Sequence, residues 1–184
     1  ACHYAMLLIA LNNKSKYDDD YQTFVDWGVN KIGSDDPNTW RTLTKEEWEY
    51  IINGRYNAEE LIGVAQVNGV NGVILLPDDW TCPSGVTFKS GFDDDYCTEC
   101  YANYQTVSES DWATLEASGA VFLPAAGFRR YGTIVANVET HGVYWSATEY
   151  NDIHAIYIRM YQIADIQCFY RHYGQSVRLV KDLE

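Results

Sequence analysis

The chain has 184 residues, 47% of them apolar and 15% aromatic, so it can bury a sizeable core and is not typical of a disordered protein. The sequence carries 26 acidic against 13 basic residues, a net charge of -13, and has no cluster of lysines and arginines. Binding to a phosphate backbone depends on such clusters, so a nucleic-acid partner is not expected. Glycines and prolines are scattered, and no linker or repeat divides the chain, which predicts a single domain over residues 1–184.

The longest apolar run, residues 4–11, is much shorter than the roughly 20 residues that a membrane-spanning helix needs. The run is compatible with the remnant of a secretion signal and equally with a buried strand. We therefore expect no membrane span.

Five cysteines, an odd number, rule out complete pairing within the chain and leave the compartment undecided. Cys97 and Cys100 form a CxxC motif, but a tetrahedral zinc site would need a second pair at a suitable spacing, and only the isolated Cys82 and Cys168 are available for it. The motif therefore favours a local disulfide or two free thiols over a metal site.

Two helices are predicted in the first two thirds of the chain. Thr44 begins a capping box with Glu47, and the helix that follows is expected to end at Gly54. A second helix is expected over residues 108–118, with Ser108 as its N-cap and Gly119 as its stop. Between them, the apolar run 72–77 ends at a proline and predicts a short buried strand.

Short strands are predicted to dominate the last third, over residues 121–124, 142–145 and 176–180. Helices thus come early and strands late, a segregation that is typical of an α+β fold rather than a parallel α/β sheet. Residues 156–161 alternate strictly between two kinds of side chain. We expect the first kind (Ile156, Ile158 and Met160) to face the core and the second kind to be displayed (Tyr157, Arg159 and Tyr161).

Several motifs in series resemble one family. They are the segments 40–50 (WRTLTKEEWEY), 76–80 (LPDDW), 122–127 (FLPAAG), 144–149 (YWSATE) and 174–180 (GQSVRLV). The first is similar to the helix-initiating motif of formylglycine-generating-enzyme-type domains, a branch of the C-type lectin fold. Together, over about residues 21–183, the motifs resemble the variable proteins of diversity-generating retroelements in bacteria and their phages, relatives of the phage major tropism determinant. Residues 1–13 and the insertion at 93–97 depart from the pattern.

The resemblance implies two helices packed on small twisted antiparallel sheets with long loops, and a variable region at about residues 150–173. In that family, error-prone reverse transcription alters adenines in certain codons, which then cannot encode Lys, Gln, Glu, Met or Trp. By resemblance, the candidate diversified and ligand-binding positions are Asp152, His154, Tyr157, Arg159, Tyr161, Ile163, Asp165, Cys168, Phe169, Tyr170, His172 and Tyr173. The scaffold between them is expected to comprise Ile156, Ile158, Met160, Gln162, Gln167 and Arg171.

The composition of this segment independently indicates a binding surface. Tyr, Phe, His, Arg and Ile are frequent, and Lys and Glu are scarce, as in protein interfaces and antibody combining sites. An arginine on a buried face would need a partner that the sequence does not identify. We therefore expect replacement of Tyr157, Arg159 and Tyr161 by alanine to abolish ligand binding and leave folding nearly intact.

Catalytic and metal motifs are not found. Formylglycine-generating enzymes work through a cysteine pair near the C-terminal region, where this chain has only Cys168. The four histidines are isolated in sequence, no GxSxG or phosphate-binding glycine loop occurs, and no cofactor is expected. The acidic runs 18–20 and 93–95 lack the ligand spacing of an EF-hand loop and are typical of solvated loops.

The sequence therefore predicts a non-enzymatic C-type-lectin-fold protein with a hypervariable surface, which binds an exterior protein or glycan on a bacterial surface or a phage tail tip. Two alternatives remain open. One is a formylglycine-generating-enzyme-like domain, and the other is a calcium-dependent sugar-binding module. The ligand and the oligomeric state are not determined by the sequence.

Overall fold

The computed structural model describes residues 26–92, 101, 104–161 and 164–182, and all structural statements below concern these residues. Its helical elements are η1 (Trp27–Val29), α1 (Lys45–Glu49), the π-helical turn η2 (Tyr50–Gly54), η3 (Ala58–Glu60) and α3 (Glu109–Ala117). Its strands are β1 (Arg41–Thr42), β2 (Ile62–Val67), β3 (Val70–Leu75), β4 (Thr106–Val107), β5 (Val121–Pro124), β6 (Phe128–Arg130), β7 (Ile134–Ala136), β8 (Gly142–Asn151), β9 (His154–Met160), β10 (Ala164–Tyr170) and β11 (Leu179–Val180).

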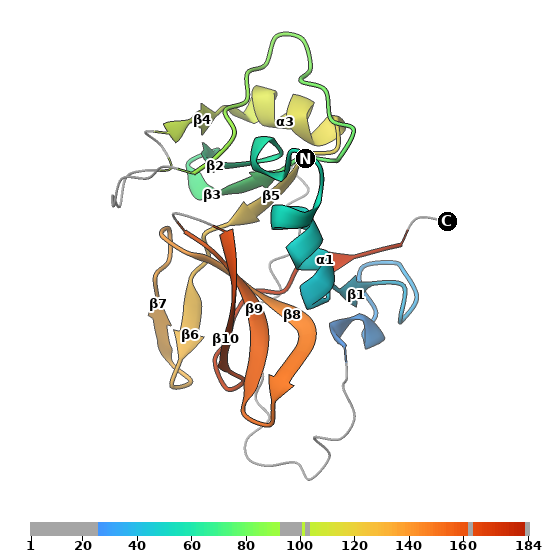
Figure 1. The fold of residues 1–184 in the computed structure, drawn as a ribbon, viewed down its shortest axis with the longest axis vertical. Helices are drawn as coiled ribbons and strands as arrows, with labels where there is room; N and C mark the ends of the chain where they lie inside the picture. Colours follow the sequence, from blue (N-terminus) through green and yellow to red (C-terminus); the bar gives the residue numbers. More distant parts are fainter. Residues whose placement is uncertain (1–25, 93–100, 102–103, 162–163, 183–184) are drawn as a thin grey trace.

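The strands form small sheets, mainly antiparallel, and the described fold is mixed α+β, as predicted. One sheet has the strand order β4-β2-β3-β5, and a second has the order β10-β9-β8. The pairs β6-β7 and β1-β11 complete the set. In Figure 1, α3 lies beside the four-stranded sheet at one end of the molecule, whereas β8, β9, β10 and the β6–β7 hairpin lie at the other end. None of the described helices has the length and apolar character needed to cross a membrane.

The four-stranded sheet has a hydrophobic cluster on each face. Its strands contribute to both clusters because successive side chains of a strand point to opposite sides. On β3, Ile74 belongs to a cluster with Leu115 of α3. Its neighbour Val73 belongs to the other cluster, which includes Trp48 of α1 and Ile158 of β9. This second cluster joins the two larger sheets and α1 into one core.

Helix α1 begins where the capping box predicts. The Thr44 hydroxyl accepts a hydrogen bond from the Glu47 amide at 3.2 Å, and the Glu47 carboxylate accepts one from the Thr44 amide at 2.8 Å. Trp48 is completely buried, and the helix continues through η2 to Gly54. The predicted second helix is α3, which is capped by Ser108 and followed by Gly119 at φ 94°. Both predicted helices are thus confirmed.

The three-stranded sheet is extended at its β8 edge by the chain at residues 174–176. The Trp145 amide donates to the Ser176 carbonyl at 2.9 Å, and the Ser176 amide donates to the Val143 carbonyl at 3.1 Å. Gly174 and Arg129 then exchange two backbone hydrogen bonds, which connect this segment to β6. The backbone ladder therefore runs from β10 to the β6–β7 hairpin. The regular strand predicted at 176–180 is shorter than expected, since only β11 pairs as a strand, with β1.

Candidate ligand-binding surface

The buried face of β9 matches the sequence pattern. Ile156 is 7% exposed, and Ile158 and Met160 are completely buried. On the paired strand β10, Ala164 and Ile166 lie opposite Met160 and Ile158 and pack against the same core. The expectation that these three β9 residues belong to the scaffold core is confirmed.

The opposite face of β9 is not uniformly displayed, and the prediction for Tyr157 was wrong. Its side chain is only 8% exposed. The ring makes edge contacts with Trp145 of β8 at 6.0 Å and with Phe169 of β10 at 6.0 Å between ring centroids. Burial also raises the pKa of the Tyr157 phenol. Tyr157 is covered because the neighbouring strands carry large aromatic rings on the same face, which alternation along β9 alone does not reveal.

Arg159, on the same face, finds a partner on β10. Its Nε donates to Asp165 Oδ1 at 3.0 Å and its Nη2 donates to Asp165 Oδ2 at 2.7 Å, which is a two-pronged ion pair. The pairing raises the pKa of Arg159. Tyr161 is half-buried and stacks on His141, with 4.1 Å between ring centroids. Of the three residues that were predicted to be displayed, Tyr157 is therefore buried, Arg159 is paired with a carboxylate, and Tyr161 is stacked on a histidine.

From Tyr157 towards the β8–β9 turn, aromatic side chains form a continuous network of ring contacts. Phe169 contacts Phe128 of β6 at 6.3 Å and Tyr173 at 4.6 Å, measured between ring centroids. Tyr173 also contacts Tyr131, at 6.0 Å. We call this network the aromatic platform and define it by the residues Phe128, Tyr131, His154, Phe169, Tyr170, His172 and Tyr173.

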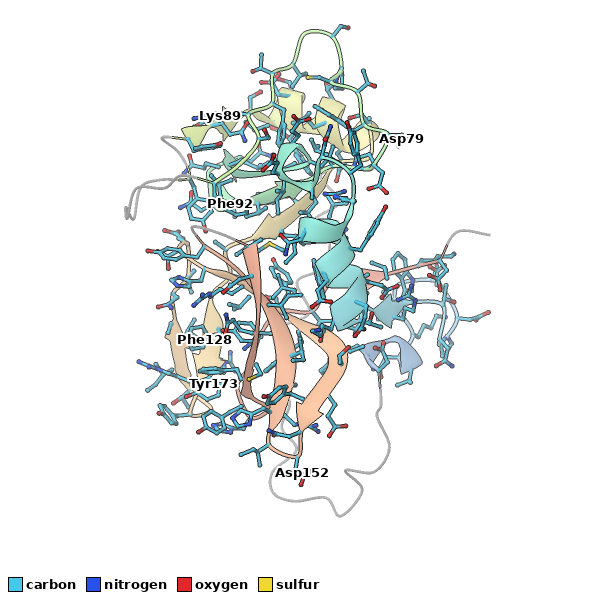
Figure 2. The ribbon with its side chains drawn as sticks, in the orientation of Figure 1. Asp79, Lys89, Phe92, Phe128, Asp152 and Tyr173 are labelled. Carbon is cyan, nitrogen blue, oxygen red and sulfur yellow. The ribbon has the colours of Figure 1, made fainter. Side chains whose placement is uncertain are left out.

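The platform is open to solvent on its outer side. Tyr131 is 69% exposed and Tyr170 is 44% exposed, and His172 is also exposed. Figure 2 shows Phe128 and Tyr173 near one another, and Asp152 farther along at the end of the β8–β9 hairpin. At that hairpin Tyr150 is 60% exposed, and its ring contacts His154, which joins the hairpin tip to the platform.

Two platform residues lie outside the segment that the sequence singled out. Phe128 and Tyr131 lie between the strands predicted at 121–124 and 142–145, where the sequence analysis predicted no strand, yet residues 128–130 form β6 and pair with β7. The aromatic and β-branched residues of positions 128–136 are a signal that would have predicted a hairpin here. The contact between Phe128 of β6 and Phe169 of β10 joins residues that are far apart in the sequence, so no local pattern predicts it.

The remaining predicted positions fall in different places. Asp152 is exposed in the β8–β9 turn, and Cys168 is an exposed free thiol on β10. Ile163 lies outside the described residues, as does the scaffold candidate Gln162. Among the other scaffold candidates, Gln167 is exposed and donates to Asp165, whereas Arg171 forms an ion pair with Glu149. Solvent exposure therefore does not fully separate the predicted ligand-binding positions from the predicted scaffold positions.

Four features noted in the sequence lie outside the described residues. They are the apolar run at 4–11, the acidic runs 18–20 and 93–95, and the Cys97 and Cys100 motif. Within the part of the chain that is described, no group of three or more His, Cys, Asp or Glu side chains is arranged to hold a metal ion. The aromatic platform itself is composed of phenylalanine, tyrosine and histidine rings.

Comparison with known proteins gave no match to the chain among family models, curated proteins or solved structures.

Proposed function

We propose that this chain is a recognition protein whose aromatic platform, together with the β8–β9 hairpin tip, binds an exterior protein or glycan. On this proposal the scaffold is a C-type lectin fold, and the C-terminal surface is diversified by a retroelement. Its setting is a bacterial surface or a phage tail tip. The motif series at residues 40–50, 76–80, 122–127, 144–149 and 174–180 supports the scaffold and the diversification.

The observation that carries the proposal is that the β9–β10 hairpin and the residues after it combine a buried face with a network of aromatic rings. Ile156, Ile158 and Met160 are buried in the core, so they hold the hairpin in place whatever its outer residues are. The candidate variable positions His154, Phe169, Tyr170, His172 and Tyr173 instead meet in one network of rings, in which Tyr170 and His172 are exposed and the other three are half-buried. A fixed inner face and an interchangeable outer face are what a diversified binding site requires.

The side chains of the platform suit recognition. Tyrosine and histidine rings offer large contact area and hydrogen-bonding groups, and few rotatable bonds are ordered on binding. The rings already pack against each other, for example Phe169 against Tyr173 at 4.6 Å between centroids. Such preorganisation lowers the entropic cost of binding, because fewer side chains must be immobilised when the ligand arrives.

The decisive experiment is to sequence the DNA around the gene. We expect a reverse-transcriptase gene and a near-copy of the codons for residues 150–180. Differences from the near-copy should lie at its adenines and should concentrate in the codons for His154, Tyr170, His172 and Tyr173. The codons for Ile156, Ile158 and Met160 are the matched control, and they should be spared.

A neighbourhood without a reverse transcriptase and without such a copy would contradict diversification. So would a near-copy that differs as often in the three control codons as in the platform codons. In either case the platform would be an ordinary fixed surface.

A further inference from the structure

We propose that the β6–β7 hairpin, which lies outside the expected variable segment, supplies a fixed part of the binding surface, and that Arg130 there binds a carboxylate of an acidic protein partner. This inference rests on the proposed function, since it names the class of partner and a constant anchor for it. Arg130 was not among the ligand-binding positions predicted from the sequence.

The geometry of the hairpin directs Arg130 towards the platform. Side chains two residues apart on a strand share a face, so Arg130 lies on the same face of β6 as Phe128, whose ring contacts Phe169 and Tyr173. Ile134 of β7 is the direct cross-strand partner of Arg130 and therefore lies on this face too. The hairpin thus extends the platform by a guanidinium group and an aliphatic side chain.

Arg130 is available to a ligand. Its side chain is exposed, and its guanidinium carbon lies 6.0 Å from the centroid of the Tyr131 ring. Among the described residues it has no carboxylate partner, whereas Arg159 is paired with Asp165 and Arg171 with Glu149. The positive charge of Arg130 also acts on Tyr173. The hydrogen bond with Tyr131 raises the pKa of the Tyr173 phenol, and the charge of Arg130 acts to lower it. Arg130 is therefore a cation at the platform edge that forms no ion pair with the part of the chain that the structure describes.

The charge of the chain is segregated in a way that favours an acidic partner at this end. Residues 121–180 contain five arginines and four carboxylates, a net charge of +1, so the rest of the chain carries -14 of the total of -13. Three of those four carboxylates, Glu149, Asp152 and Asp165, lie in the β8–β10 region, and two of them are already paired with arginines. Most of the molecule is acidic and repels an acidic partner. The surface that carries Arg130 repels such a partner least, so electrostatics favours binding there.

The aliphatic side chains of the hairpin favour a protein over a glycan. Ile134, on the same face of the hairpin as Arg130, is 46% exposed, and Val138, which follows β7, is 50% exposed. These groups form no hydrogen bonds, so a polyhydroxylated ligand gains little from them. A protein surface with apolar side chains beside a carboxylate matches both features, because arginine pairs with a carboxylate through two parallel hydrogen bonds.

The test is to pan a random peptide library displayed on phage against the purified full chain, with a glycan array probed in parallel. We expect the enriched peptides to carry Asp or Glu next to an apolar residue. Affinity for the most enriched peptide should fall about tenfold in Arg130→Ala, because a charge-assisted hydrogen-bonded pair is lost. Arg130→Lys should recover part of the loss, since lysine keeps the charge without the two-pronged geometry.

Charge reversal gives the sharpest readout. Arg130→Glu should change the selected peptides from acidic to basic, whereas Lys31→Glu, an equal charge change at an exposed position between η1 and β1, should leave the selection acidic. Enriched peptides without acidic residues, or with affinities insensitive to Arg130, would overturn this inference and leave the proposed function standing. Glycan binding that depends on Tyr170 without any peptide enrichment would have the same meaning. No binding in either format would count against both.

Discussion

Arg159 and Asp165 face each other across the β9–β10 hairpin and form two parallel hydrogen bonds, of 3.0 and 2.7 Å. Their side chains are 40% and 20% exposed, so solvent screens much of the attraction. We expect a double-mutant cycle with Arg159→Ala and Asp165→Ala to give a coupling free energy of about 1 kcal/mol in urea unfolding. The control is the surface pair Lys45 and Glu49 of α1, for which a smaller coupling free energy is expected. Equal coupling in the two pairs would argue against the geometric advantage of the arginine pair.

Tyr157 and Tyr170 are both candidate ligand-binding positions, but the structure predicts opposite effects of replacing them. Tyr157 is 8% exposed and Tyr170 is 44% exposed. Tyr157→Ala should lower the free energy of unfolding by about 3 kcal/mol because it leaves a cavity between Trp145 and Phe169. Tyr170→Ala should cost less than about 1 kcal/mol.

Denaturant unfolding of the two single variants measures the difference. A Tyr157→Ala variant as stable as Tyr170→Ala would show that Tyr157 is displayed after all. The predicted alanine triple variant that includes Tyr157 is for this reason a poor test of binding. Tyr170→Ala combined with His172→Ala changes exposed residues of the platform and should preserve folding.

Arg55 is a buried arginine that holds two chain segments together. It is 8% exposed, its Nη1 donates to the Leu76 carbonyl at 2.6 Å, and its Nη2 donates to the Leu61 carbonyl at 3.1 Å. Arg55→Ala should lower the free energy of unfolding by about 3 kcal/mol, because the Leu76 and Leu61 carbonyls each lose a hydrogen bond and the Leu61 carbonyl keeps only the Leu76 amide as its donor. The control is Asp78→Asn, which weakens the ion pair to Arg55 at a side chain that is 55% exposed and should cost under about 1 kcal/mol. Similar losses in the two variants would indicate that the ion pair, rather than the carbonyl contacts, carries the stabilisation.

His141 should make stability depend on pH. Burial, and to a lesser extent the charge of Arg159, lowers the pKa of His141 below its ordinary value of 6.5. The unfolded chain therefore takes up a proton near pH 6.5 that the folded chain does not, and the free energy of unfolding should fall as the pH drops below 6.5. Above that pH this histidine should contribute no pH dependence.

Urea unfolding at about pH 7.5 and about pH 5.5, compared with His141→Gln, isolates this contribution from those of the other titratable groups. The variant should lose less stability on acidification than the wild type. An NMR titration of the His141 ring with a midpoint at or above 6.5 would contradict the prediction.

The sequence by itself determined the local elements. The capping residues Thr44 and Ser108 predicted where α1 and α3 begin, because a cap is a hydrogen bond between residues three apart in the chain. Strict alternation predicted the buried face of β9, because successive strand side chains must point to opposite sides. The α+β class followed from the order of these elements.

Only the tertiary structure decided what covers the other face of β9 and which residues meet in the platform. Tyr157 is buried by rings from β8 and β10, and Phe128 of β6 reaches Phe169 of β10 across 41 residues of sequence. Arg159 is paired because the register of the hairpin sets it opposite Asp165. Such contacts depend on strand register and on how distant segments pack together, and no local pattern of residues determines either.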